Sequence, residues 1–195
     1  MNSLRPIALA ALVLAASSAV AQTPAPTARI QAFYDVLLDC MKNAATLKVK
    51  GRYDKLAPIV PVTFDVDAMA AAAIGRAFAK FPADKQSAIR EAFGKLITAS
   101  YANRFRGYTG ESFTVDPKAT TRGADTQVDS KIIPKTGAPV VIDYLMRDKG
   151  VEDVLLDGTV SQIAQFRLRF GDAAAGGPDA LLAALSGETN KLLAE

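Results

Sequence analysis

The segment PADKQSAIREAFGKLITASYANRFRGY, residues 82–108, decides the fold that this sequence predicts. Its large apolar residues recur mostly at steps of three and four, the spacing of one face of an α-helix. Pro82 suits the first helical turn, and Gly107 and Gly110 are the expected end. Such a helix would extend roughly 40 Å, enough to cross a domain. We expect the other elements to pack along its apolar face, formed by Ile89, Phe93, Leu96, Ile97, Tyr101, Phe105 and Tyr108.

The chain before this segment has helical patterns too. Apolar stripes at helical spacing cover residues 30–48, 53–60 and 66–81. The first should end before Gly51, and the last should break near Gly75, because glycine weakens helices. A series of helices is therefore expected ahead of the long one.

After residue 110 the pattern changes from helical spacing to alternation, and it returns to helix at residues 160–170 and 180–193. Spacers rich in Gly, Pro or Asp separate the alternating runs, as in an antiparallel meander. Helices, strands and helices in this order predict an α+β domain with helices on one face of a twisted sheet. About four strands are expected, at residues 111–117, 126–133, 140–146 and 151–157.

The first 21 residues have the order of a secretory signal peptide. Arg5 precedes an apolar run at residues 7–16, and Ala19-Val20-Ala21 forms an A-x-A cleavage site. The alternative is a buried or membrane helix, although the run is shorter than the roughly 18 apolar residues that span a bilayer. We therefore predict export and cleavage before Gln22.

The mature chain would consist of a Pro-rich spacer, residues 22–27, and one domain, residues 28–195. Removing Arg5 from the 23 Lys and Arg leaves 22, against 20 Asp and Glu, so the mature net charge is +2. Such a balance favours neither nucleic acid nor a membrane surface. The single cysteine, Cys40, has apolar neighbours and is expected to be a buried thiol, with a reactive thiol as the alternative.

Few side chains suggest catalysis. The sequence has no histidine, which excludes Ser-His, Cys-His and His-metal sites. Asp35 and Asp39 fall outside the apolar stripe, Asp65 or Asp67 suits a helix N-cap, and Asp153 has no evident partner. We predict no enzymatic activity, no metal and no cofactor. The complete apolar faces fit either a filled core or a cavity for an apolar ligand.

Several motifs stand out along the chain: GRYDKLAP (51–58), TFD (63–65), IGRAF (74–78), YTG (108–110), IDYLM (142–146), DVLLDGTVS (153–161) and GPDAL (177–181). They resemble the toluene-tolerance family, the soluble periplasmic phospholipid-binding component of the Mla lipid-transport system. They keep their order over most of the chain, and the last two look most similar to the hopanoid-biosynthesis-associated branch. The sequence departs from the family at residues 149–152, where members commonly have a Gly-Trp-Lys-type strand.

The resemblance implies a mixed helix and sheet fold whose interior holds lipid acyl chains. It implies a monomeric periplasmic carrier, not an enzyme, for a phospholipid or hopanoid-type lipid with little headgroup selectivity. Its partners would be an inner-membrane ABC-type transporter complex and an outer-membrane lipoprotein complex. The expected lipid-binding residues are Phe33, Leu37, Phe64, Met69, Ile74, Phe78, Phe93, Leu96, Ile97, Tyr101, Phe105, Phe113, Val115, Val128, Ile132, Val140, Ile142, Tyr144 and Met146.

Two other functions compete with lipid carriage. One is an enzyme of a similar conical fold, in which a buried Asp with a raised pKa acts as a base on a hydrophobic substrate. The other is a module with a filled core that only tethers a membrane complex. Mass spectrometry of organic extracts from the purified protein discriminates between them best. A stoichiometric lipid would support the carrier, and a bare protein with a filled core would support the tether.

Overall fold

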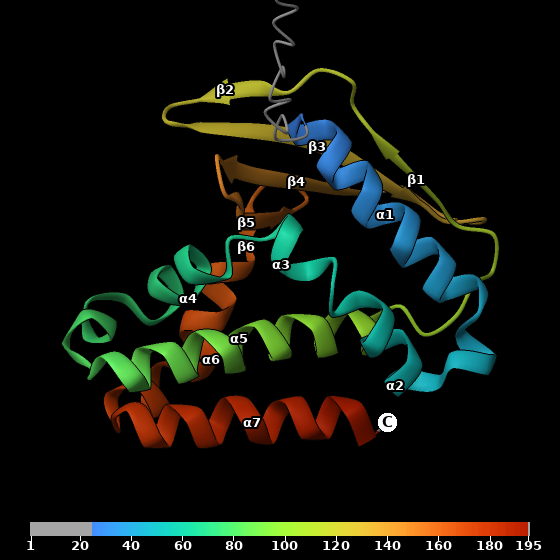
Figure 1. The fold of residues 1–195 in the computed structure, drawn as a ribbon. Coiled ribbons are helices and arrows are strands. Elements are labelled where there is room, and N and C mark those ends of the chain that lie inside the picture. Colours follow the sequence, from blue (N-terminus) through green and yellow to red (C-terminus); the bar gives the residue numbers. More distant parts are fainter. Residues whose placement is uncertain (1–24, 195) are drawn as a thin grey trace, which may run out of the picture.

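The computed structural model describes residues 25–194, and helices and an antiparallel sheet make up this part of the chain (Figure 1). The predicted signal peptide lies outside the described residues, as do the first residues of the predicted spacer. Its last two residues, Pro26 and Thr27, already belong to a helix. Within the described part, no helix is both long and apolar enough to cross a membrane.

The sheet has the order β1-β3-β4-β5-β6, and the short strand β2 pairs with β3 beside β1. Every strand pair is antiparallel. The four strands expected from the alternation correspond to β1, β3, β4 and β5, and two short strands complete the sheet. The strands are β1 (Ser112–Val115), β2 (Thr120–Arg122), β3 (Asp125–Ile133), β4 (Val140–Arg147), β5 (Gly150–Leu156) and β6 (Val160–Ser161).

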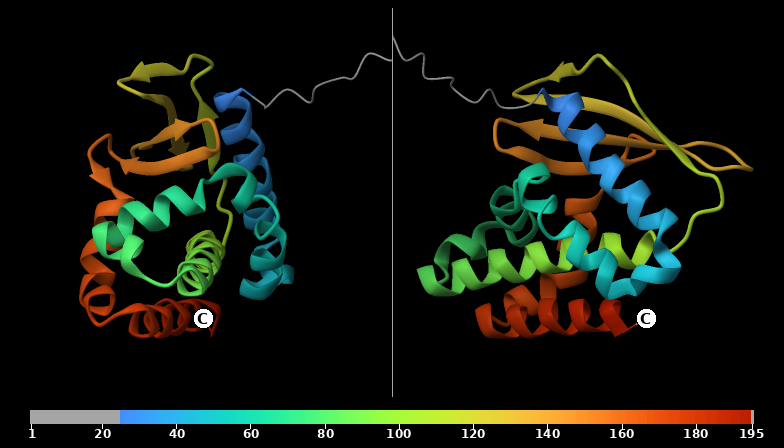
Figure 2. Two further views of the ribbon diagram at one scale, coloured as in Figure 1. Left: turned by 60° about the vertical axis from the view of Figure 1, so that its left-hand side comes forward. Right: turned by 45° about the vertical axis from the view of Figure 1, so that its right-hand side comes forward.

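The helices pack on the sheet, which confirms the predicted α+β class. In Figure 1 the sheet is uppermost, α5 crosses below it, and α7 lies against the other side of α5. Figure 2 shows that α1 runs beside the sheet while α4, α6 and α7 surround α5. The helices are α1 (Pro26–Lys42), α2 (Ala44–Leu56), α3 (Val60–Thr63), α4 (Val66–Ile74), the 3-10 helix η1 (Gly75–Lys80), α5 (Ala83–Arg104), α6 (Gln162–Ala175) and α7 (Pro178–Ala194).

The long helix is shorter than the sequence pattern predicted. Helix α5 has 22 residues, so it extends roughly 33 Å. Phe105 leaves the helical region with φ −97° and ψ 61°. The apolar spacing continues to Tyr108, yet that side chain is 42% exposed. The prediction that glycines 107 and 110 end the helix was therefore wrong, because the chain leaves helical geometry before it reaches them.

The predicted first helix is in fact two helices. Asn43 ends α1, and its side-chain amide donates to the Asp39 carbonyl oxygen at 2.9 Å. Inside α2, Lys48 has φ 54°, outside the helical region, and marks a kink. Gly51, the predicted end, lies within α2. By contrast, the break predicted at Gly75 is confirmed, since α4 changes there to the 3-10 helix η1.

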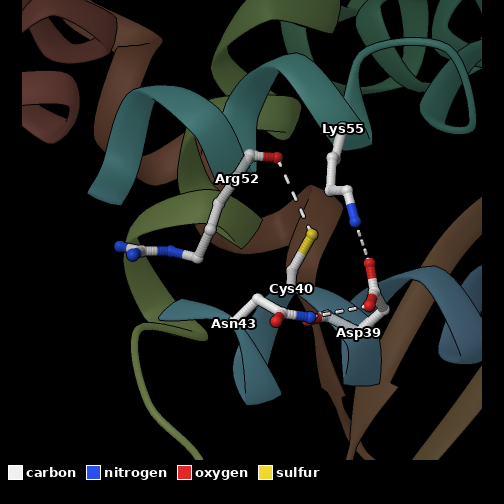
Figure 3. A network of polar contacts seen from close by, with 5 residues as sticks. All are labelled: Asp39, Cys40, Asn43, Arg52 and Lys55. Atoms are coloured by element: carbon white, nitrogen blue, oxygen red, sulfur yellow. Dashed lines mark hydrogen bonds and ion pairs between the residues drawn. The ribbon is translucent and has the colours of Figure 1, made fainter. Parts of the chain in front are cut away.

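The joint between α1 and α2 buries the cysteine (Figure 3). Cys40 is fully buried, and its thiol points at the Arg52 carbonyl oxygen, 3.9 Å away. Burial raises the pKa of this thiol. On the outer side of the joint, Asp39 pairs with Lys55 and accepts a hydrogen bond of 2.8 Å from the Asn43 amide. The predicted burial of Cys40 is confirmed, and the polar cluster joins the two helices around it.

The family departure at residues 149–152 gives a tight hairpin between β4 and β5. Gly150 has φ 150°, and a Cβ atom there would lie 2.6 Å from the Thr63 carbonyl oxygen. Only glycine allows the hairpin backbone to come this close to the backbone of Thr63. The following residue, Val151, accepts a hydrogen bond of 2.9 Å from the Asp65 amide. The hairpin thus joins the sheet to the start of α4, where Asp65 is the N-cap and accepts from the Ala68 amide.

Candidate functional site

A cavity of about 720 Å³ separates the helices from the sheet. Its walls come from α1, α4, α5 and α6 on one side and from β3, β4, β5 and β6 on the other. Pockets of about 300–1,000 Å³ hold small ligands in other proteins. The sequence left a filled core and a cavity as alternatives for this interior, and the structure contains a cavity.

Helix α5 presents one face to the cavity. Ile97, Ser100, Tyr101 and Arg104 line it at the spacing i, i+3, i+4 and i+7. Ile97 lies deepest, since it is 3% exposed, whereas Ser100 and Tyr101 are half-buried. Arg104 ends the helix and is exposed. The face therefore changes from apolar to cationic toward the end of the helix.

Helix α6 repeats this arrangement across the cavity with Gln162, Gln165, Phe166 and Arg169. Ser161 is the N-cap of the helix and accepts a hydrogen bond of 3.0 Å from the Ala164 amide. Only the aromatic ring of the four is apolar, and Arg169 is again exposed. The two helices therefore contribute most of the polar side chains in the cavity wall.

The sheet contributes an apolar wall. Its cavity-lining residues lie in cross-strand pairs, because residues opposite each other in an antiparallel sheet share a face. The register brings together Ile132 with Val140, Tyr144 with Val154, and Ile142 with Leu156. Val160 of β6 extends this wall.

The exposure of the lining residues separates a floor from a mouth. The floor consists of side chains at most 3% exposed, from α1, α4 and α5 and the segment before α4. At the mouth, Val140 and Val160 are each 43% exposed, and Arg104, Gln165 and Arg169 are exposed as well. The cavity thus combines an apolar interior with an opening that carries two arginines. The floor residues are Tyr34, Leu37, Phe64, Met69 and Ile97.

Three buried hydroxyl groups, two of them from residues that line the cavity, form a chain of hydrogen bonds. Tyr144 donates to the Tyr34 hydroxyl at 3.0 Å, and Tyr34 lies 2.7 Å from the Ser130 hydroxyl. Ser130 in turn donates to the Ile142 carbonyl oxygen at 2.6 Å, so it accepts from Tyr34. Burial raises the pKa of Tyr34, Tyr144 and Tyr101. The tyrosines are therefore neutral near pH 7, and the floor carries no charge.

The expected lipid-binding residues divide into two groups. Ten of them line the cavity: Leu37, Phe64, Met69, Ile97, Tyr101, Phe105, Ile132, Val140, Ile142 and Tyr144. Nine do not line it: Phe33, Ile74, Phe78, Phe93, Leu96, Phe113, Val115, Val128 and Met146. Phe33, for instance, lies behind the wall, with its ring 4.9 Å from that of Tyr101. Lipid contact stays a prediction for every residue in both groups.

Ten lining residues were not expected from the sequence. Ser100 and Arg104 follow Ile97 at helical spacing, so that spacing could have placed them on the same face. The lining of α6 had no such signal, because most of it is polar. The others are Tyr34, Val154, Leu156, Val160, Gln162, Gln165, Phe166 and Arg169.

Phe166 also separates the cavity from a second, much smaller void. That void, of about 10 Å³, lies among α4, α5, α6 and α7. Phe166 lines both spaces, and its ring lies 5.0 Å from that of Phe93. This one aromatic ring is therefore part of the wall between the hollow and the filled halves of the interior.

The buried carboxylate with a raised pKa lies away from the cavity. Asp143 alternates with Ile142 and Tyr144 along β4, so its side chain is on the other face of the sheet. Burial raises its pKa, and Asp129, directly opposite on β3, raises it further. This carboxylate does not face the cavity as the base of an enzyme would. Residues 25–194 contain no group of three or more His, Cys, Asp or Glu that could hold a metal ion.

Comparison with known proteins agrees with this architecture. Residues 31–187 match the family model described as MlaC protein. The fold is similar to a phospholipid-binding protein from Ralstonia solanacearum, solved in complex with a phospholipid. The TM-score is 0.68 at 22% identity, over 87% of this chain and 99% of that one. No curated protein sequence matches significantly. Because the family model covers most of its length, the chain belongs to the MlaC family.

Proposed function

We propose that this protein is a lipid carrier that shelters the acyl chains of a phospholipid in the cavity between α5 and the sheet. The observation that supports this most is the hollow itself, about 720 Å³ with an apolar floor and an open mouth. Each methylene removed from water contributes about 0.8 kcal/mol, so chains in the cavity need no charged partner. The lipid headgroup would remain at the mouth.

The proposal extends to where and between what the carrier works. The signal-peptide pattern and the family favour the periplasm, with cleavage before Gln22 leaving the spacer, residues 22–27, and one lipid-binding domain, residues 28–195. Lipid would pass between an inner-membrane ABC-type complex and an outer-membrane lipoprotein complex. A hopanoid-type lipid is the alternative cargo, since an apolar wall accepts any hydrocarbon of suitable shape.

The test is to purify the protein without detergent and to identify lipids in organic extracts by mass spectrometry. We expect about one phospholipid per protein, and a lower melting temperature after delipidation, because a ligand that binds only the folded state stabilises it. Leu156→Trp, which fills part of the cavity, should reduce the lipid content. Leu168→Trp is the matched control, since Leu168 is 79% exposed on α6.

Two results would contradict this function. Protein that carries no lipid, and takes none up from phospholipid vesicles, would favour a tether instead. Equal lipid content in both tryptophan variants and the wild type would show that lipid binds outside the cavity.

A further inference from the structure

The mouth of the cavity is chemically two-sided. On the sheet side its exposed residues are Val140 and Val160. On the helix side they are Arg104 of α5, and Gln165 and Arg169 of α6. A lipid with its chains inside would meet hydrogen-bond donors on one side only, at the level where its headgroup begins.

The two arginines differ in how strongly they are already paired. Arg169 forms an ion pair with Glu188 of α7, which offsets its charge. Arg104 has no ion pair with any carboxylate in residues 25–194. The helix side of the mouth therefore carries about one uncompensated positive charge, held by Arg104.

The nearby start of α6 does not supply a second anion site. The Asp153 carboxylate already accepts from the Ile163 amide at 3.1 Å and from the Ser161 hydroxyl at 2.5 Å. The Ile163 and Ala164 amides at the start of α6, which could otherwise attract an anion, are therefore already bonded within the protein. An anion at the mouth has to be held by the side chains.

We propose that Arg104, with Arg169 and Gln165, binds the anionic phosphodiester of the lipid headgroup. This inference rests on the proposed function, because it takes the acyl chains to lie in the cavity. Guanidinium groups bind phosphate oxygens through paired, charge-assisted hydrogen bonds, and glutamine adds a neutral donor. The carrier should then select against lipids that are equally apolar but have no anionic group, contrary to the weak headgroup selectivity expected from the sequence.

The test offers the lipid-free protein two lipids with the same oleoyl chains, dioleoylphosphatidylglycerol and dioleoylglycerol, at equal mole fractions in mixed micelles. Bound lipids are then extracted and quantified. Wild type should prefer the phosphatidylglycerol, by up to roughly tenfold at low salt, and less as salt screens the exposed charge. In Arg104→Gln, uptake of phosphatidylglycerol should fall toward that of dioleoylglycerol. Arg104→Lys keeps the positive charge but loses the planar pair of N–H donors, so its lipid preference should be intermediate.

Arg106→Gln is the matched control. Arg106 is exposed two residues further along and does not line the cavity, so removing its charge should leave the lipid ratio unchanged. A lipid ratio that falls equally in Arg104→Gln and Arg106→Gln would overturn the site in favour of general surface charge. Melting temperatures of all variants verify that they fold.

The remaining outcomes separate the two proposals and the two sources of phosphate. Equal uptake of both lipids by wild type would overturn the headgroup site and leave lipid carriage intact. Uptake of neither would overturn carriage itself. Inorganic phosphate is titrated into the lipid-free protein as well. If it binds through Arg104 while the lipid ratio is the same in Arg104→Gln, the site serves a free anion, and the headgroup assignment is wrong.

Discussion

Two neighbouring parts of the apolar stripe on α5 border very different interiors. At the middle of the helix, Phe93 faces α6 and α7 across a void of only about 10 Å³. Toward its end, Ile97 and Tyr101 face the sheet across about 720 Å³. One uninterrupted apolar stripe thus serves as core packing and as cavity wall. The comparison teaches that the stripe predicts burial, whereas the distance to the opposite element decides whether the space is filled.

The first prediction concerns the filled part of the interior, beside the middle of α5. Phe93→Ala should lower the free energy of unfolding by about 3–5 kcal/mol, because the side chain is 2% exposed and enclosed by other helices. Urea unfolding of lipid-free protein measures this. Leu168→Ala, at an exposed position of α6, should change it by less than about 0.5 kcal/mol. A loss for Phe93→Ala as small as that of the control would show that this part is hollow too.

The second prediction removes the wall between the two spaces. Phe166→Ala should cost about 2 kcal/mol, less than Phe93→Ala, because one side of the ring already faces the cavity. It should also join the small void to the cavity. Lipids extracted from this variant should therefore shift toward longer chains, as mass spectrometry would show. An unchanged chain-length distribution would mean that Phe166 does not limit the cavity.

The third prediction concerns the hollow part of the interior. Ile142→Ala should cost roughly 1 kcal/mol or less in lipid-free protein, because part of the side chain has no protein contacts to lose. The same change should clearly reduce retained lipid, since the lipid loses apolar contact area. Denaturant melts of delipidated protein and separate lipid quantification test both parts. A loss of several kcal/mol with lipid content unchanged would place Ile142 in an ordinary core.

The smallest effect is expected on the outer face of the sheet. Because the folded-state pKa of Asp143 is raised above its ordinary value of 3.8, ionisation opposes folding. Its contribution is most favourable below that value and is lost as pH rises through the folded pKa. Asp143→Asn should therefore be more stable than wild type at pH 7, and this advantage should shrink toward pH 4. Urea melts across this range, with exposed Asp172→Asn as control, measure it. An advantage independent of pH would contradict the mechanism.

Elements with a strong period could be predicted from the sequence, and those fixed by contacts could not. The alternation of β3, β4 and β5 and the stripe of α5 are visible in the residues themselves. The positive φ of Lys48 interrupts α2, and a lysine gives no sequence signal for such a break. Strand β6 has only two residues, and Val160 also fits the helical spacing that follows, so its strand was missed.

The residues that line the cavity could be predicted only in part. Apolar positions on α5 and β4 pointed to the interior, but they could not say which of them face open space. The lining face of α6 is mostly polar, and a search for apolar stripes passes over Gln162, Gln165 and Arg169. A cavity with a polar mouth therefore becomes visible only when two helices and the sheet are placed together.

The hydroxyl chain in the cavity wall bears on how an apolar ligand would leave the cavity. From Tyr144 through Tyr34 and Ser130 to the Ile142 carbonyl, each hydroxyl donates its one proton within the protein. None of these donors is left for a cargo molecule, so a hydrocarbon chain that slides past them breaks no hydrogen bond. If acyl chains occupy the cavity, this part of the wall would contact them without hydrogen bonds and would add no polar barrier to their release.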